Sequence, residues 1–319
     1  MTAFAAHAGS SRAPLIPYIG RFAPTPSGPL HLGSLTAAVI SWLDARSRNG
    51  VWHLRIDDID RPRVVTGAAD SIQRTLDCFG LGWDGPVVYQ SRRVPAYLEV
   101  ATQLQSRGHA FSCACSRRDV AAAGLPGWEG PIYPGTCSAG LRAGQAARAL
   151  RLRAEQHHWV VEDRCLGPVG FDLHWLGGDF VIRRADGLFA YQLATVVDDV
   201  ELGVTNVVRG IDLLGSVPRQ LQLYQCLGQS APTYLHHPVV VGRGRSKLAK
   251  SSGAAPVGCR EPATTLARVL SAIGIPVVES GFARSDAVAE LLEHAVAHWH
   301  PGLLPHEPIP ESLLCSGES

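Results

Sequence analysis

The segment at 20–33 holds more residues that could take part in chemistry than any other; it reads Gly-Arg-Phe-Ala-Pro-Thr-Pro-Ser-Gly-Pro-Leu-His-Leu-Gly. It follows a short apolar run, and His31 and Gly33 stand where a helix is expected to begin. Free N–H groups and the helix dipole at that point can hold phosphate oxygens. The imidazole of His31 can donate to a phosphate oxygen as charge builds in a transition state. Gly33 would let a base or a ribose approach the backbone. An ordinary strand-to-helix turn with a chance histidine is the alternative.

A second segment, at 244–252, reads Gly-Arg-Ser-Lys-Leu-Ala-Lys-Ser-Ser. Lys247 and Lys250 lie three residues apart between small residues, which predicts a mobile cationic loop. Such a loop can close over a triphosphate and stabilise a departing pyrophosphate. Taken alone, it is better explained as a solvated surface loop.

Together the two segments resemble the paired signatures of class I aminoacyl-tRNA synthetases, usually written H-I-G-H and K-M-S-K-S. Here they stand as His31-Leu32-Gly33-Ser34 and Lys247-Leu248-Ala249-Lys250-Ser251. The residues from 21 to 33, and Leu-Arg-Ile-Asp-Asp-Ile-Asp-Arg-Pro-Arg at 54–63, resemble the glutamyl/glutaminyl branch of that family. The resemblance implies adenylate formation from ATP, with Mg²⁺, and ATP contacts from His31, Gly33 and Lys250. Ala249 departs from the family pattern and removes one hydroxyl donor.

A glutamate site must bind one ammonium and two carboxylates, so it needs an acid and several cationic or donor groups. Arginine can meet a carboxylate bidentately. The resemblance implies that the amino acid is held by Arg21, Phe22, Ala23, Pro24, Thr25, Asp57, Tyr191 and Arg209. The family usually has Glu where this chain has Asp57, which shortens the arm that would meet the ammonium group. For Arg209 the alternative is a salt bridge to Asp198, Asp199 or Asp212, and for Tyr191 it is core packing.

Three cysteines stand close together as Cys113-Ala-Cys115 and Cys137, one ligand short of a closed zinc site. The fourth ligand could be water, a histidine or the phenolate of Tyr133. Short synthetase-like proteins of the family resembled have a zinc held by Cys-x-Cys, Tyr and Cys, and all four positions match. The alternative is three buried free cysteines. The other five cysteines are predicted to be single core or surface residues, without a disulfide framework: Cys78, Cys165, Cys226, Cys259 and Cys315.

The elements that must position these residues alternate between strand and helix. A strand at 18–22, a helix at 34–46 and a strand at 51–56 make a βαβ unit, which predicts a parallel sheet. A helix at 70–79 and a strand at 87–89 continue the pattern. The predicted fold is therefore α/β, with a Rossmann-type nucleotide-binding domain. The expected divisions are a disordered extension at 1–17, the two halves of the catalytic domain at 18–100 and 187–262, a zinc-containing insertion at 101–186 and a helical tail at 263–319.

The bulk composition suits a soluble globular enzyme, with 46% hydrophobic and 18% charged residues in 319. A formal net charge of +1 argues against a protein that coats nucleic acid by charge alone. No apolar run approaches the about 20 residues that span a bilayer, and the N-terminus lacks the pattern of a signal peptide. We therefore expect a cytoplasmic monomer.

The segment after Ser252 is too short for the anticodon-reading domain of a full synthetase. The chain is therefore similar to the short members of the family. These members activate glutamate without tRNA and transfer it to the queuosine base of tRNA(Asp), so the implied partners are ATP, L-glutamate and queuosine-containing tRNA(Asp). Two alternatives are a truncated enzyme that charges the 3′ end of tRNA(Glu) and a non-catalytic module that binds RNA or protein. The lysines at 247 and 250 argue against the second alternative.

Overall fold

The computed structural model describes residues 17–242, 248, 254–277 and 287–315. Its first half is a parallel three-stranded sheet in the order β1-β2-β3, formed by Ile19–Phe22, Val51–Ile56 and Val88–Tyr89. Helix α1 (Leu32–Arg46) connects β1 to β2, and α2 (Ala68–Cys78) precedes β3. The predicted βαβ unit is thus confirmed.

The second half of the parallel layer comes from a distant part of the chain. Strands β11 (Asn206–Gly210) and β12 (Thr233–His237) pair in parallel. Helix α5 (Tyr191–Glu201) precedes β11, and α6 (Val217–Leu227) lies between the two strands in sequence. The backbone N–H of Thr205 donates to the carbonyl of Ile19 at 2.9 Å, which sets β11 beside β1. Because α1 packs against β1, β2 and β11, both halves share one core. The α/β, Rossmann-type prediction is confirmed at this level.

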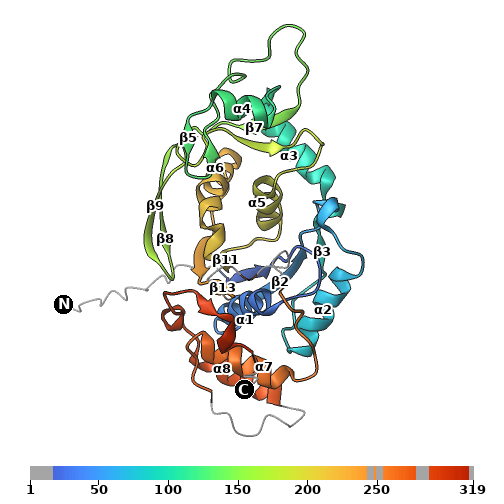
Figure 1. Cartoon of the computed structure of the whole chain (residues 1–319), viewed down its shortest axis with the longest axis vertical. Coiled ribbons are helices and arrows are strands. Elements are labelled where there is room, and N and C mark those ends of the chain that lie inside the picture. Colours follow the sequence, from blue (N-terminus) through green and yellow to red (C-terminus); the bar gives the residue numbers. More distant parts are fainter. Residues whose placement is uncertain (1–16, 243–247, 249–253, 278–286, 316–319) are drawn as a thin grey trace, which may run out of the picture.

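The segment between the two halves forms the upper part of Figure 1. Strands β4 (Ala110–Cys113), β7 (Ala149–Leu152) and β10 (Phe180–Arg183) make an antiparallel sheet. Two hairpins accompany it: β5 (Pro126–Gly127) with β6 (Gly130–Pro131), and β8 (His158–Asp163) with β9 (Gly167–Asp172). Helix α4 (Arg117–Ala123) follows β4, whereas α3 (Val94–Ser106) runs across the expected boundary at 100/101. The last residue of β8, Asp163, pairs with Tyr234 of β12, so the insertion rejoins the parallel layer.

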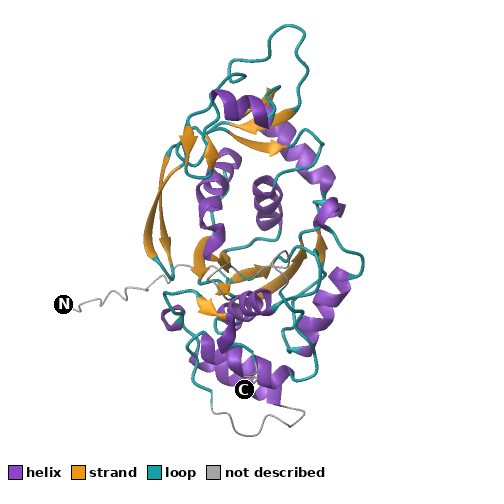
Figure 2. Cartoon of the chain, in the orientation of Figure 1, coloured by secondary structure: helices purple, strands orange, loops and turns teal. Residues whose placement is uncertain are grey.

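The C-terminal segment closes the opposite side of the parallel layer. Helices α7 (Pro262–Ala272) and α8 (Ala287–His298) pack together, and α8 contacts α1. Figure 2 shows these helices on the side of the parallel strands that faces away from the insertion. A short pairing of β13 (Val240–Val241) with β14 (Ile309–Pro310) fixes the end of the chain. None of the helices in the described ranges is long and apolar enough to cross a bilayer. Of the extension expected at 1–17, only Pro17 belongs to those ranges.

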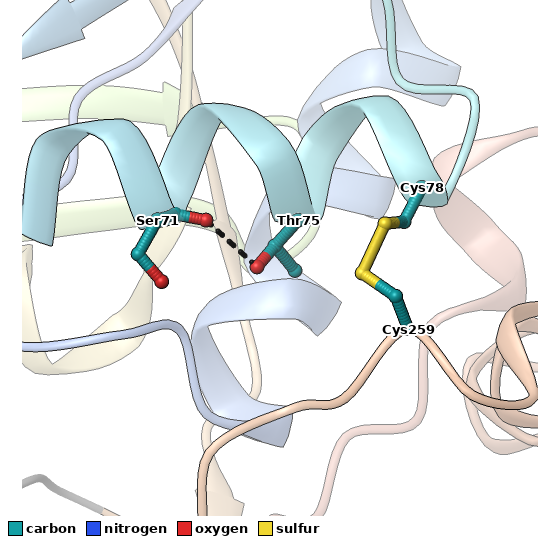
Figure 3. The surroundings of a disulfide bond; sticks show 4 residues. All are labelled: Ser71, Thr75, Cys78 and Cys259. Carbon is teal, nitrogen blue, oxygen red and sulfur yellow. Dashed lines mark hydrogen bonds between the residues drawn. A yellow bond between two sulfur atoms is a disulfide. The ribbon is translucent and has the colours of Figure 1, made fainter.

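One prediction about the cysteines is wrong. Cys78 and Cys259, which were expected to be single residues, form a disulfide across a separation of 181 residues. Figure 3 shows the bond joining the end of α2 to the segment before α7. The sequence gives no sign of this pair, since only the packing of α2 against the C-terminal segment brings their Cα atoms to 5.8 Å. Cys113, Cys115, Cys137, Cys165, Cys226 and Cys315 are free thiols.

Candidate active site

His31 forms the N-cap of α1. Its Nδ1 accepts from the backbone N–H of Ser34 at 3.3 Å, and the Ser34 hydroxyl accepts from the His31 N–H at 2.8 Å. This reciprocal capping box satisfies two orphan donors of the helix and holds the ring at the helix start. It also gives a reason for serine at the last position of the first signature. A Cβ on Gly33 would lie only 3.1 Å from Cε1 of His31, so glycine leaves room for the ring.

The second signature lies largely outside the described residues, including Lys247 and Lys250. Leu248, between the two lysines, is buried in the main core, and its N–H donates to the carbonyl of Val240 at 2.8 Å. Beyond the loop, Pro256 forms a bridge with His31, and Val257 donates to the carbonyl of Leu30 at 2.8 Å. The chain on each side of Lys250 is therefore anchored next to the first signature.

The end of β1 and the loop that follows it carry the expected glutamate contacts at 21–25. Arg21 is buried, and its Nε donates to both oxygens of Asp199, at 3.1 and 3.3 Å. Phe22 is buried against Trp52, whereas Ala23, Pro24 and Thr25 are half-buried. The structure thus gives Arg21 a carboxylate partner within the protein, and the sequence had not suggested this partner.

Asp57 is tied to the same loop by its backbone, whose N–H donates to the carbonyl of Pro24 at 3.0 Å. Its carboxylate is buried and accepts from Nε and Nη2 of Arg55, at 2.7 and 3.2 Å. Burial raises the pKa of Asp57 to about 6, although the adjacent Arg55 guanidinium acts in the opposite direction. Asp57 can therefore change its charge close to physiological pH.

The sequence reasoning gave Arg55 no role, although it belongs to the motif at 54–63. Its side chain is fully buried and also donates from Nη1 to Asp199 at 2.7 Å, while Nε lies 3.7 Å from Asp198. A fully buried arginine needs carboxylate partners. The sequence did offer one clue: Asp198 and Asp199 stand together on the apolar helix α5, where they need a cationic partner.

Arg209 lies at the end of β11 and is also buried, but its partners are neutral. Nε donates to Nε2 of His236 at 3.0 Å, and Nη1 donates to Oε1 of Gln220 at 2.9 Å and to the hydroxyl of Tyr191 at 3.5 Å. Its guanidinium lies over the ring of Tyr234, 5.4 Å from the centroid. In the described ranges, no carboxylate oxygen lies within 4.0 Å of the Arg209 side-chain nitrogens, and Nη2 has no hydrogen-bond partner. Within the described residues, Arg209 therefore does not form the alternative salt bridge to Asp198, Asp199 or Asp212.

The predicted cysteine group is brought together in the insertion. The Sγ atoms of Cys113, Cys115 and Cys137 lie within 4.8 Å of one another, and the last two are 3.7 Å apart. The hydroxyl of Tyr133 lies 3.5 Å from Sγ of Cys113 and accepts from the backbone N–H of Cys137 at 2.8 Å. Two thiolates bound tetrahedrally at about 2.3 Å from zinc would lie about 3.8 Å apart. The donor set and its spacing therefore fit a zinc ion.

Comparison with known proteins agrees with the resemblance carried by the two signatures. Residues 19–123 and 136–260 match the family described as tRNA synthetases class I (E and Q), catalytic domain. The chain therefore belongs to this class of synthetases, and the resemblance of the two signatures is confirmed. Within the class, the chain belongs to the family of proteins named Glutamyl-Q tRNA(Asp) synthetase. It is 48% identical to such a protein from Chromobacterium violaceum over 92% of this chain and 97% of the relative. A relative of that name from Dechloromonas aromatica is 49% identical over 91% and 97%.

Solved structures support the fold alone. A glutamate tRNA ligase from Elizabethkingia meningosepticum, crystallised in complex with its amino acid, superimposes with a TM-score of 0.75 at 22% identity. The match covers 92% of this chain and 66% of that protein. Glutamate-tRNA synthetase from Elizabethkingia anophelis gives a TM-score of 0.76 at 22% identity, with 95% and 68% covered.

Proposed function

We propose that this chain activates L-glutamate with ATP and Mg²⁺ and transfers the glutamyl group to the queuosine base of tRNA(Asp). Relatives nearly half identical over almost their whole length carry the name of that activity. The match covers 97% of the length of each of these two relatives, so the activity in their name is compared over nearly the whole protein.

The observation that carries the glutamate part of the proposal is the buried guanidinium of Arg209. Arg21 and Arg55 are buried too, but each is paired with an aspartate. Arg209 has only neutral partners, with Nη2 left over in the described part of the chain. Because an isolated charge is costly to bury, such a guanidinium favours an anionic ligand. A carboxylate of glutamate has the charge and the planar shape to be that ligand.

The proposed chemistry has two steps and uses no protein nucleophile. An oxygen of the glutamate α-carboxylate attacks the α-phosphorus of ATP and expels pyrophosphate. His31, Lys247 and Lys250 stabilise the developing negative charge, while Gly33 leaves space beside His31. A hydroxyl of the queuosine cyclopentene ring then attacks the adenylate carbonyl and expels AMP. We expect Lys250→Ala to reduce glutamate-dependent ATP–pyrophosphate exchange far more than glutamate binding; exchange at the wild-type rate would contradict this role.

The experiment that tests the transfer supplies labelled glutamate and ATP together with tRNA from normal cells and from queuosine-deficient cells. Label only on queuosine-containing tRNA(Asp) is the expected result. Label on tRNA(Glu) from the deficient cells would instead indicate a small synthetase that charges the 3′ end. If neither label nor adenylate appears, the proposed activity fails and the alternative of a non-catalytic binding module stands.

The cysteine group is proposed to hold one structural zinc ion through Cys113, Cys115, Tyr133 and Cys137. The support is the convergence of three thiols from two segments of the insertion, with Cys115 and Cys137 at a sulfur–sulfur distance that suits tetrahedral zinc. Purified protein should contain one zinc per chain by elemental analysis, and Cys137→Ser should lose it. Cys165→Ser, at a half-buried free thiol outside the group, is the control and should retain the metal. Metal-free wild-type protein that remains fully folded would contradict a structural role.

A further inference from the structure

Three polar residues from neighbouring strands form a chain of hydrogen bonds that ends at Arg209. Asp163 is the last residue of β8, His236 lies in β12, and Arg209 lies directly opposite His236 in the β11–β12 register. Nδ1 of His236 lies 2.7 Å from Oδ2 of Asp163, and Nε2 of His236 lies 3.0 Å from Nε of Arg209. All three side chains are buried, with His236 fully so.

The bonding pattern fixes the proton on the imidazole. Arginine keeps its protons, so Nε of Arg209 can only donate, and Nε2 of His236 must accept. The ring proton therefore lies on Nδ1, facing Asp163. The Asp163 carboxylate is held in turn by the backbone N–H groups of Cys165, at 2.9 Å, and of His236, at 3.1 Å. Burial lowers the pKa of His236 and Arg209 acts in the same direction, while Asp163 opposes them, which agrees with a neutral ring.

We propose that Asp163 and His236 are positioning residues that set the rotation of the Arg209 guanidinium towards the amino-acid carboxylate. This inference rests on the proposed glutamate site. Nε is held by His236 and Nη1 by Gln220, which leaves Nη2, itself buried, as the guanidinium nitrogen without a hydrogen-bond partner among the described residues. Tyr234, stacked on His236 with ring centroids 5.8 Å apart, supports both groups from one face. Asp163 belongs to the insertion, so the insertion acts directly on the amino-acid site.

Three variants separate positioning from structural support. His236→Leu removes the acceptor for Nε, whereas His236→Gln offers an amide oxygen in its place. Asp163→Asn keeps the shape, but its amide donates to Nδ1 and drives the ring proton to Nε2, where it opposes the Nε–H of Arg209. His53→Leu is the matched control, because His53 is also a strand histidine and bonds a backbone carbonyl, that of Asp84.

The measurement is glutamate-dependent ATP–pyrophosphate exchange, with KM determined separately for glutamate and for ATP. His236→Leu and Asp163→Asn should raise the KM for glutamate about ten- to hundred-fold, with the KM for ATP and the Tm little changed. His236→Gln should restore most of the loss, and adding Asp163→Asn to it should change little further. His53→Leu should match the wild type.

Two results would overturn the inference in distinguishable ways. If the wild type shows exchange but His236→Leu leaves the KM for glutamate unchanged, or raises both KM values with a lower Tm, the positioning role is wrong while the proposed function stands. If the wild type shows no glutamate-dependent exchange, the proposed function fails and the positioning role fails with it.

Discussion

Asp57 shows how far a single residue can be interpreted from sequence. Its place in the motif at 54–63 predicts that it lies near the amino-acid site, and the backbone bond to Pro24 does place it beside the loop at 21–25. Its partner could not be predicted in the same way. Asp57 directly follows β2, but the pairing of Arg55 is shared with Asp198 and Asp199 of α5, which is distant in sequence.

The charge of Asp57 should set the pH dependence of glutamate use. With a pKa of about 6, the carboxylate becomes protonated as pH falls through that value and loses the charge with which we propose it pairs with the α-ammonium group. We expect the KM for glutamate to rise as pH falls from 7.5 to 5.5. Asp57→Asn should have a KM raised about ten- to hundred-fold at pH 7.5, as for the loss of one charge-assisted bond, and a flatter pH profile. Steady-state exchange kinetics across that range would check this, and an equally steep profile in the variant would contradict it.

At the scale of elements, Asp44 joins three parts of the chain that are far apart in sequence. It lies in α1, is fully buried, and accepts two bonds of 2.6 Å from Arg164, between β8 and β9. It also accepts from Tyr18, before β1, and from Trp299 after α8, the latter at 3.1 Å. Burial favours the protonated form, but the bonds and charge of Arg164 outweigh it and lower the pKa of Asp44.

Asp44→Asn should therefore destabilise the fold by about 2–4 kcal/mol at pH 7, because it leaves Arg164 without its counter-charge. Urea denaturation measures this difference. Asp84→Asn is the control: Asp84 pairs with Arg46 but is 41% exposed, so its loss should cost about 1 kcal/mol or less. Since the pKa of Asp44 is lowered by folding, its contribution should also decline as pH falls below 4. A cost equal to that of Asp84→Asn would contradict this account.

Features that depend on local contacts could be predicted from the sequence, whereas those that depend on contacts between distant parts of the chain could not. Elements with local signals were located to within about two residues, such as the helix expected at 34–46 and found at Leu32–Arg46, and the strand at Val51–Ile56. The grouping of Cys113, Cys115 and Cys137 is also as predicted, because the three cysteines stand in one short part of the sequence. The partners of Arg209 could not be found: His236 and Gln220 come from β12 and α6, and only strand pairing and helix packing select them.

At the scale of the whole molecule, the Cys78–Cys259 disulfide links the first half of the catalytic unit to the end of the second half. It fastens the segment after the second signature to α2, beside the residues that bridge to His31. A cross-link between residues 181 apart restricts the unfolded chain strongly.

Under oxidising conditions Cys78→Ser should therefore lower the free energy of unfolding by about 2–5 kcal/mol. With a reductant present, wild type and variant should unfold at nearly the same denaturant concentration. Cys165→Ser, at a half-buried free thiol, should not show this dependence on reductant. Identical unfolding of wild type and Cys78→Ser without reductant would show that the bond adds no stability.

The neutral surroundings of Arg209 also have a consequence for how stable the free protein can be. A site arranged to attract an anion keeps a buried positive charge uncompensated until the anion arrives, so ligand recognition opposes folding at this position. Arg209→Met fills a similar volume without the charge, but it leaves Nε2 of His236 and Oε1 of Gln220 without their donor, so the two effects on the stability of the ligand-free protein should largely cancel while exchange is abolished. Glutamate should raise the Tm of the wild type but not of the variant. The charge of Arg209 then stabilises the ligand-bound protein and contributes little to the stability of the free protein.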